Sequence, residues 1–369
     1  MKIFLTSDIH LGMKFAGYPS IQEKLVEARF STLENCIELA NKKKCELFVV
    51  AGDLFDRVSV AKRDIQKGAT ILSEFEGRLA VVLPGNHDFI TTGQEDLWSF
   101  FKSYMGDNIL VLELAKVYSL AHYDLDVNLY AAPCESKRSP ENRIDWIQHV
   151  KKDNNIKHHI GIAHGSLEGL SPDFNKEYFP MTESELLSAC LDIWLMGHTH
   201  IQYPVKPGPR SKIYYPSTPE PDGFDCEHEG KVLILEIDDT GKIQPVFVST
   251  GKYLFKHEKI VIKGFKEIED TVKKYSTGKY KNTLLKLRLK GRLPREEFEK
   301  LYNAREEIER QLTYLDFDSS EVTIEIRPDD IDKSFISHSF PHRLLNDFAE
   351  KGDYEALQIA FDLIQEARK

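Results

Sequence analysis

Residues 78–89 read RLAVVLPGNHDF: an apolar run, then Pro-Gly, then an amide, an imidazole and a carboxylate. A short apolar run closed by Pro-Gly is typical of a buried strand that ends in a turn. The turn would place Asn86, His87 and Asp88 at the carboxyl end of that strand. Stability alone gives no reason for such a trio, so its meaning depends on whether other strands end in the same way.

Four more predicted strands end in polar residues, most of them beside a glycine. These strands cover residues 2–6, 47–51, 159–163 and 193–196, and the polar residues that follow them are Ser7, Asp8, His10, Asp53, Asp56, His164, His198 and His200. Helical patterns lie between several strands, at residues 21–43, 61–75, 95–104 and 141–153. This alternation predicts an α/β fold with ligands gathered at the carboxyl ends of the strands. We therefore expect five loops at one edge of one sheet.

The pattern changes near residue 251, which predicts more than one domain in this chain of 369 residues. The first domain would cover residues 1–251 and end in antiparallel strands at 213–215, 232–237 and 245–249. A small α+β domain would follow over residues 252–328, with a long charged helix at 295–312 and a strand at 321–327. Residues 329–369 would form a helical tail.

The strand-ending residues have the chemistry of a metal site. Seven of them offer carboxylate, amide or imidazole ligands: Asp8, His10, Asp53, Asn86, His164, His198 and His200. Seven ligands are too many for one ion, whereas two ions that share one carboxylate would use them all. Two metal ions about 3.5–4 Å apart stabilise the attacking and leaving oxygens of an in-line phosphoryl displacement. Mixed ligands without thiolate favour Mn, Fe or Zn over Mg or Ca, with Mn expected first and Mg kept as an option.

Five blocks in this order, D-x-H, G-D-L-F-D, G-N-H-D, A-H-G and G-H-T-H, resemble the calcineurin-like metallophosphoesterases over roughly residues 1–250. Within that superfamily the chain is similar to the SbcD/Mre-type DNA repair exonucleases, through TSDIHLG at residues 6–12 and the long helix after it. The stretch YPSTPEPDGF at residues 215–224 is similar to the YhaO-like branch. The resemblance implies a metallophosphoesterase-type layered β-sandwich flanked by helices, a small capping domain and an ATPase-binding tail.

The resemblance also implies a role for each ligand. Asp8, His10 and His200 would hold one metal, Asn86, His164 and His198 the other, and Asp53 would bridge them. His87 would not be a ligand. It would contact the scissile phosphate, where it would stabilise the transition state or protonate the leaving 3′ oxygen.

Two carboxylates near these blocks are assigned supporting roles. Asp88 would orient the imidazole of His87. Many Mre-type members carry a histidine where this chain has Asp56, so a second phosphate-contacting histidine is absent from that loop. Three roles stay open for Asp56: a hydrogen bond to His87, a hydrogen bond to a water at the metal, or a cap on the next segment.

Charge is unevenly distributed along the chain. Residues 256–292 hold twelve Lys or Arg against four Asp or Glu, a net charge of +8, and the whole chain carries −10, which leaves −18 for the remainder. A solvated basic face is the simpler explanation, and a strip that faces DNA phosphates is the functional one. The candidate DNA-contacting residues are Lys273, Lys274, Lys279, Lys281 and Arg288.

Composition argues against membrane and secreted classes. No apolar run approaches the roughly 20 residues of a membrane span, and residues 2–8 look like a core strand rather than a signal peptide. The five cysteines are scattered and odd in number, which suits a reducing compartment. We therefore expect a cytoplasmic protein.

These features predict a Mn-dependent phosphodiesterase, specifically a DNA nuclease with 3′–5′ exonuclease or endonuclease activity at single- or double-stranded DNA ends in double-strand-break repair. The first alternative is a phosphodiesterase for a small-molecule nucleotide. A basic segment so far beyond the last ligand argues against it, and the neutral residues FITT at 89–92 argue against a phosphomonoester substrate. The second alternative, a non-catalytic scaffold subunit, would lack ligands, and none is missing.

Two protein partners are implied by the resemblance. The first is an SbcC/YhaN-like ATPase at the tail, where Leu357, Phe361 and Ile364 recur near i, i+4 and i+7. Packing of this stripe on the chain's own domain is the alternative. The second is another copy of the chain, in a homodimer through residues 21–43 or 95–104.

Overall fold

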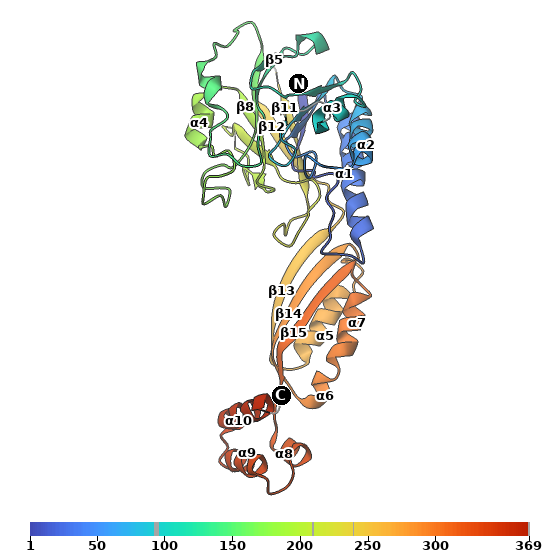
Figure 1. Cartoon of the computed structure of the whole chain (residues 1–369), viewed down its shortest axis with the longest axis vertical. Coiled ribbons are helices and arrows are strands. Elements are labelled where there is room, and N and C mark those ends of the chain that lie inside the picture. The colour runs from blue at the N-terminus through green and yellow to red at the C-terminus, as the bar shows by residue number, and fades with distance from the viewer. Residues whose placement is uncertain (92–95, 209, 239, 368–369) are drawn as a thin grey trace. The chain divides into compact units, whose positions relative to one another are not determined.

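The computed structural model describes residues 1–91, 96–208, 210–238 and 240–367. Thr92 and Glu95, which belong to the predicted neutral loop and to the predicted helix at 95–104, lie outside these ranges. The chain divides into two compact units, Met1–Leu254 and Phe255–Lys369 (Figure 1).

The first unit contains a six-stranded sheet in the order β12-β11-β1-β2-β3-β4. Its strands are β1 (Lys2–Thr6), β2 (Leu47–Ala51), β3 (Leu79–Leu83), β4 (Ile109–Val111), β11 (Lys231–Ile237) and β12 (Ile243–Ser249). Strands β1 to β4 are parallel, whereas β11 and β12 extend the sheet antiparallel beside β1. Every residue of β2 and β3 is buried, which explains why both are continuous apolar runs.

A second six-stranded sheet of the first unit has the order β5-β6-β7-β8-β10-β9. Its strands are β5 (Val117–Ser119), β6 (Val127–Ala132), β7 (His158–His164), β8 (Ile193–Gly197), β9 (Gln202–Tyr203) and β10 (Ile213–Pro216). The two sheets pack face to face, since Leu5 and Val49 of the first share a buried cluster with Ile160 and Leu195 of the second. The predicted α/β fold class, with layered sheets flanked by helices, is confirmed.

Two sequence-based expectations about these sheets were wrong. The predicted ligand loops do not leave one sheet: β1, β2 and β3 belong to the first sheet and β7 and β8 to the second. The run at 213–215 is not antiparallel to its main neighbour, because β10 pairs parallel with β8 and antiparallel only with the two-residue strand β9. In both cases the error concerns which strands pair, for example β1 with the distant β11, and the apolar pattern of a single strand does not reveal its partner.

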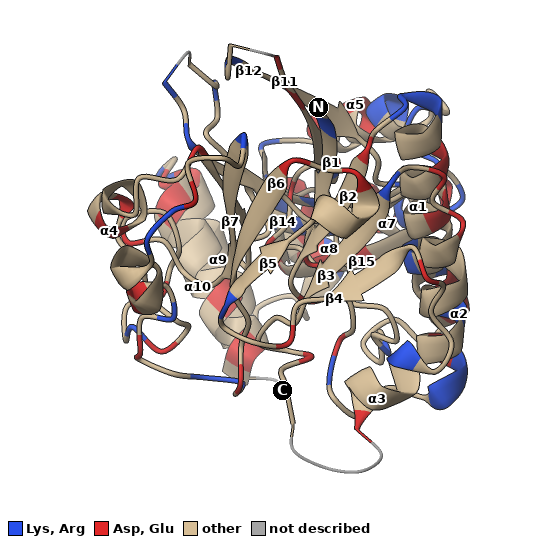
Figure 2. Cartoon of the chain, turned by 90° about the horizontal axis from the view of Figure 1, so that it is seen from above, with Lys and Arg blue, Asp and Glu red and all other residues tan. Residues whose placement is uncertain are grey.

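Three helices pack on the outer face of the first sheet: α1 (Gln22–Lys42), α2 (Lys62–Ser73) and α3 (Leu97–Lys102). Leu33 of α1 and Ile65 of α2 share a buried cluster with Phe4 and Phe48 of the sheet. Figure 2 shows both acidic and basic residues over α1 and α2, so this layer carries mixed charge rather than a patch of one sign.

The prediction of a helix at residues 141–153 was wrong. Only a short 3-10 helix, η2 (Asp145–His149), forms there, and another, η1 (Ala121–Tyr123), lies between β5 and β6. The side chain of Asn142 accepts a hydrogen bond from the N–H of Ile144, which offers the backbone an alternative to a helical turn. The next α-helix in the chain, α4 (Glu183–Ser188), begins at a capping box formed by Thr182 and Glu185.

The second unit contains a three-stranded sheet in the order β13-β14-β15. Its elements are β13 (Leu254–Ile262), α5 (Lys266–Tyr275), β14 (Thr283–Leu293), α6 (Arg295–Phe298), α7 (Leu301–Glu309) and β15 (Tyr314–Ile324). The predicted helix at 295–312 is therefore two helices. The predicted strand at 321–327 begins earlier, at Tyr314, because β15 pairs in parallel with β14 from Leu284 to Leu293.

Three helices complete the second unit: α8 (Pro328–Ser334), α9 (Phe340–Glu350) and α10 (Tyr354–Ala367). Leu357 and Phe361 of α10 are buried in a cluster with Ile331 of α8 and Leu345 of α9. Of the two arrangements considered for the stripe 357–361–364, packing on the chain's own helices is therefore the one that Leu357 and Phe361 adopt. Within the described residues, no helix combines the length and the apolar character that crossing a bilayer requires.

Candidate metal centre

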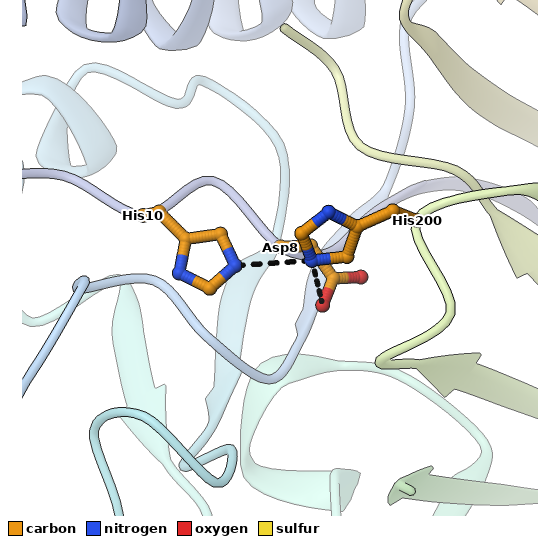
Figure 3. A group of neighbouring side chains, drawn as sticks. All are labelled: Asp8, His10 and His200. Carbon is orange, nitrogen blue, oxygen red and sulfur yellow. Dashed lines mark hydrogen bonds and ion pairs between the residues drawn. The ribbon is translucent and has the colours of Figure 1, made fainter. Parts of the chain in front are cut away.

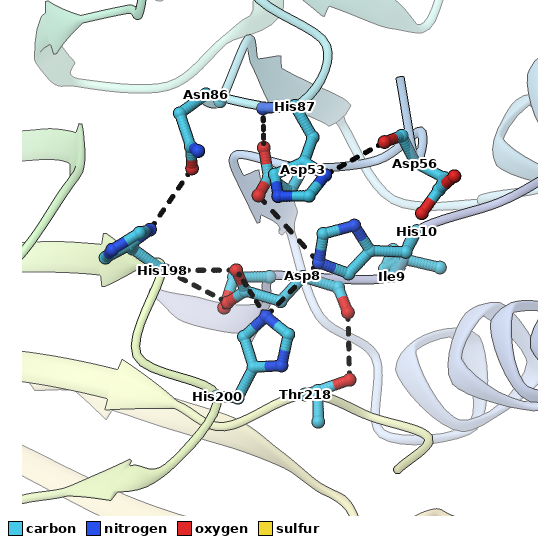
Figure 4. A network of polar contacts seen from close by, with 12 residues as sticks. Asp8, Ile9, His10, Asp53, Asp56, Asn86, His87, His198, His200 and Thr218 are labelled. Atoms are coloured by element: carbon cyan, nitrogen blue, oxygen red, sulfur yellow. Dashed lines mark hydrogen bonds and ion pairs between the residues drawn. The ribbon is translucent and has the colours of Figure 1, made fainter. Parts of the chain in front are cut away.

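The structure brings all seven candidate ligands together at the carboxyl ends of strands from both sheets. Figure 4 shows six of them: Asp8, His10, Asp53, Asn86, His198 and His200. Asp8 and His10 follow β1, Asp53 follows β2, Asn86 follows β3, His164 ends β7, and His198 and His200 follow β8. Five of the seven have a positive φ: Asp8, His10, Asp53, His198 and His200. Residues other than glycine adopt such backbone at a cost of order 1–3 kcal/mol each, and a concentration of them is a mark of functional sites.

One cluster consists of Asp8, His10 and His200 (Figure 3). The Nε2 atoms of His10 and His200 lie 3.2 Å apart, and Nε2 of His200 lies 3.5 Å from Oδ1 of Asp8. Asp8 and His10 are fully buried, whereas a quarter of the His200 side chain is exposed. Burial lowers the pKa of His10 well below its usual range, which keeps that ring neutral and able to accept a cation.

A second cluster is centred on the side-chain oxygen of Asn86. This oxygen lies 3.0 Å from Nε2 of His164 and 3.1 Å from Nδ1 of His198. The other ring nitrogen of His164, Nδ1, lies 2.9 Å from the main-chain oxygen of Ala51. A carbonyl on Nδ1 fixes the tautomer that leaves Nε2 free to bind a metal. Burial lowers the pKa of His198 to about 3, so this ring is also neutral.

Asp53 lies between the two clusters. Its Oδ2 is 3.2 Å from Nε2 of His164 and 3.8 Å from Nε2 of His10, one residue of each cluster. Burial opposes ionisation of Asp53, but His164, His10 and His87 hold the pKa of its carboxyl below its usual range. Conversely, burial opposes protonation of His164, while Asp53 and Asp8 raise its pKa to about 9. The negative potential that favours this proton would equally favour a metal cation.

The donor set fits two divalent ions. Asp8, His10 and His200, and also Asp8, Asp53 and His164, present ligand atoms that all lie within 4.8 Å of one another. In the first cluster two imidazole nitrogens face each other, and in the second one amide oxygen meets two imidazole nitrogens. Each cluster thus brings together the nitrogen and oxygen atoms that a divalent cation binds. Oxygen and imidazole ligands suit Mn, Fe and Zn alike, so the ligands do not choose among them.

His87 is half-buried beside the first cluster, with its ring centre 4.7 Å from that of His10. Its Nδ1 lies 2.9 Å from the main-chain oxygen of Asp56. The carboxylate of Asp56 instead forms an ion pair with Arg57 at 2.8 Å. Of the three roles open for Asp56, a hydrogen bond to His87 is therefore present, but the backbone makes it (Figure 4).

The expectation that Asp88 orients the His87 ring was wrong. Oδ1 of Asp88 accepts a hydrogen bond from the N–H of Gly85 at 2.7 Å, and Oδ2 accepts one from the N–H of Phe55 at 2.9 Å. Burial and the nearby Asp53 raise the pKa of Asp88 to about 7. Asp88 thus joins the loops after β2 and β3, and it affects His87 only through the shape of those loops.

Sequence reasoning missed the residues that support the first cluster. In the stretch 215–224, the hydroxyl of Thr218 donates to the main-chain oxygen of Asp8 at 2.8 Å (Figure 4), and the hydroxyl of Ser217 donates to that of His200 at 3.0 Å. The signal was present, since this stretch matched the YhaO-like pattern, but its polar residues were assigned no role.

The candidate DNA-contacting residues lie in the second unit. Lys273 and Lys274 end α5, Lys279 and Lys281 follow it, and Arg288 is in β14. Arg288 forms ion pairs with Asp316 at 2.8 Å and Asp318 at 3.4 Å, and Lys274 forms one with Glu258 at 2.5 Å. Lys273, Lys279 and Lys281 are exposed.

Two facing sheets with candidate carboxylate, amide and imidazole ligands at their strand ends are the arrangement expected of a metal-dependent phosphoesterase. The family model of the calcineurin-like phosphoesterases matches residues 1–202, so the chain belongs to this family.

The comparisons also returned individual relatives. The chain is 24% identical over 206 residues to the uncharacterized metallophosphoesterase YhaO of Bacillus subtilis strain 168, which covers 53% of this chain and 47% of that protein. It thus spans about half the length of the curated relative that it matches. Among solved structures, TT1561 of Thermus thermophilus is 13% identical, with 66% of this chain and 97% of that chain covered and a TM-score of 0.41. A dimetal phosphatase from Danio rerio is 10% identical, with 68% and 99% covered and a TM-score of 0.38.

Proposed function

We propose that this calcineurin-like phosphoesterase is a Mn-dependent DNA nuclease of the SbcD/Mre type, which hydrolyses phosphodiester bonds at DNA ends in double-strand-break repair. The observation that carries the phosphodiesterase part is the position of Asp53 between two ligand clusters, with His87 held beside them. The DNA part rests on the resemblance of the motifs and on the basic segment 256–292.

In this proposal Asp8, His10, Asp53 and His200 hold one ion, and Asp53, Asn86, His164 and His198 hold the other. When bound, the ions would activate water and offset the charge of the phosphate. The oxygen of Asp56 keeps a proton on Nδ1 of His87, which leaves Nε2 as the atom that meets the substrate. A second proton, on Nε2, would be transferred to the leaving 3′ oxygen.

The proposed DNA contacts are narrower than the sequence alone suggests. Lys273, Lys279 and Lys281 are exposed, whereas Arg288 and the equally exposed Lys274 would have to release acidic partners to bind phosphates. Because the chain is acidic outside the basic segment, DNA affinity should be modest and should fall steeply with salt.

For the partners, we propose that an SbcC/YhaN-like ATPase binds the tail through an apolar groove rather than through the stripe at 357 and 361. The groove lies on α9 and α10 and is lined by Leu344, Phe348, Ile359 and Leu363. Ile359 is 51% exposed and Leu363 is 60% exposed, which suits the burial of an amphipathic helix. Leu363→Glu should prevent copurification with the co-expressed ATPase, and Lys351→Glu should not.

We also propose that the chain forms a homodimer through α1 or α3.

The decisive experiment is Mn²⁺-dependent degradation of end-labelled linear DNA by the purified chain. His87→Ala should abolish degradation and leave the metal content of the protein unchanged, since His87 is not assigned as a ligand. His122→Ala, at an exposed histidine outside the site, is the matched control. Cleavage by both the wild type and His87→Ala would refute the role given to His87.

The alternative functions predict other outcomes. Hydrolysis of bis-p-nitrophenyl phosphate with DNA left intact, both alone and with the ATPase, would favour a small-molecule phosphodiesterase. A chain that binds no metal and hydrolyses neither substrate would be a scaffold subunit.

A further inference from the structure

We propose that Asp222 is a positioning residue of the metal centre, which holds the ring of His200 through Nδ1 and is itself held by the buried Arg29. The inference rests on the two-metal centre proposed above, but not on the identity of the substrate. It gives a physical role to the stretch 215–224, whose acidic residues the ligand assignment leaves unused.

The two ring nitrogens of His200 face different surroundings. Nε2 lies 3.2 Å from Nε2 of His10 and 3.5 Å from Oδ1 of Asp8, on the side of the ligand cluster. Nδ1 lies 3.5 Å from Oδ2 of Asp222, on the opposite side. A carboxylate at the far nitrogen of a metal-binding histidine fixes its tautomer, restricts its rotation and strengthens it as a ligand. His164 and His87 have main-chain oxygens in the same position, so His200 differs in using a charged partner.

Arg29 connects this carboxylate to the other ligands of the first cluster. Its side chain comes from α1 and is only 1% exposed. Nη1 donates a hydrogen bond to the main-chain oxygen of Ile9 at 2.6 Å, and Nη2 lies 3.4 Å from Oδ2 of Asp222. Ile9 stands between Asp8 and His10 in the sequence. One guanidinium thus contacts both the turn that carries two ligands and the carboxylate behind the third.

A third metal ion is the competing explanation for this group. Asp222, Cys226 and Nδ1 of His200 also lie close enough together to hold an ion. The guanidinium of Arg29, at 3.4 Å from Asp222, opposes another cation there. The Cys226 sulfur lies 3.4 Å from Oδ1 of Asp222, a contact in which the thiol can donate to the carboxylate. These contacts satisfy Asp222 without a metal and favour the positioning role.

The test uses Asp222→Asn in the full chain, with Asp225→Asn, an exposed aspartate of the same loop, as the control. Binding of Mn²⁺ is measured by calorimetry and counted by elemental analysis. We expect Asp222→Asn to weaken the binding of one of the two ions by about 10- to 100-fold, as loss of a carboxylate behind a histidine ligand does. The affinity for the other ion should be unchanged. Two ions bound with wild-type affinity would overturn the proposal.

The ring of His200 provides a readout independent of activity. In ¹⁵N-histidine-labelled protein without metal, assigned with His200→Gln and recorded at a pH high enough to leave this ring neutral, the remaining proton should reside on Nδ1. Asp222→Asn should shift the ring to a mixture of both tautomers, because the carboxylate that selects Nδ1–H is gone. An unchanged tautomer would refute positioning by Asp222. If the wild type binds fewer than two ions but Asp222→Asn still changes the His200 tautomer, the two-metal proposal alone is refuted.

Loss of Asp222 leaves Arg29 buried without its acidic partner, which can unfold the chain. The double variant Arg29→Met, Asp222→Asn removes both charges and separates this effect from that on His200. We expect the double variant to fold and to bind one ion as weakly as Asp222→Asn does. Recovery of wild-type affinity in the double variant would show that the unpaired charge caused the defect, and would overturn the proposal.

Discussion

The main-chain N–H of His87 donates a hydrogen bond to Oδ1 of Asp53 over 2.8 Å. The other oxygen of the same carboxylate lies 3.2 Å from Nε2 of His164. One side chain thus connects the loops after β2, β3 and β7, which belong to two different sheets. Asp53 therefore shapes the site as well as contributing charge to it.

Asp53→Asn should remove both metal ions at micromolar concentrations of Mn²⁺, because it neutralises a carboxylate that lies close to a histidine of each cluster. Asn86→Ala should remove one ion, since the side-chain oxygen of Asn86 contacts His164 and His198 of the second cluster. Equilibrium dialysis followed by elemental analysis measures both. Retention of two tightly bound ions by Asp53→Asn would contradict a bridging position.

Gly85→Ala should disable the site without unfolding the chain. A Cβ at position 85 would lie 2.2 Å from Oδ1 and 2.4 Å from the main-chain nitrogen of Asp53, so the two loops must separate. Displacement of a catalytic group by about 1 Å lowers a rate on the order of 100-fold. Gly17→Ala, where a Cβ would meet nothing within 4 Å, is the control. Equal phosphodiesterase rates in the two variants would contradict the close packing of these loops.

The ligand positions could be predicted from sequence because each depends on a local pattern, an apolar strand that ends in a polar residue at a turn. Asp53 and His164 could thus be placed at strand ends without knowledge of the strand pairing. The two-sheet arrangement could not, because it depends on pairing between distant segments such as β1 and β11.

The role of a side chain was hardest to predict where sequence neighbours are not contact neighbours. Asp88 follows His87 in the chain, yet its carboxylate binds the N–H groups of Gly85 and Phe55. Arg29 and Asp222 are far apart in the sequence and meet only because α1 and the loop after β10 pack together. The apolar periodicity correctly predicted a helix at α10, but it did not reveal whether Leu357 contacts a partner protein or the chain's own helices.

His158 should make the protein less stable in mild acid. Burial lowers the pKa of this side chain in the folded protein, whereas an unfolded histidine titrates near 6.5. As pH falls below about 6.5 the unfolded chain binds a proton that the folded chain does not, so stability decreases, by at most about 1.4 kcal/mol per pH unit. Urea unfolding in EDTA at pH 7 and pH 5 should show a smaller loss in His158→Asn than in the wild type. His122→Asn, at an exposed position, should match the wild type, and equal losses in all three would contradict the prediction.

Gln358 should hold α10 to the end of β15. Its side chain is 4% exposed, and its oxygen accepts a hydrogen bond from the N–H of Ile326 at 3.0 Å while its nitrogen donates to the main-chain oxygen of Ile324 at 3.0 Å. Gln358→Leu keeps the bulk but removes the partner of both main-chain groups, of which the Ile326 N–H is buried. An unpaired buried group of this kind costs roughly 1–3 kcal/mol.

Hydrogen exchange of the full chain measures this effect directly. Opening of α10 should become roughly 10- to 100-fold more frequent in Gln358→Leu, and the amide of Ile326 should lose its protection. Gln365→Leu, at a half-exposed position two turns along the same helix, should leave exchange at Ile326 unchanged. If both variants exchange alike, the apolar cluster around Leu357 and Phe361 holds the tail without help from Gln358. A partner bound in the groove of α9 and α10 would then meet a tail that the apolar cluster alone keeps against the end of β15.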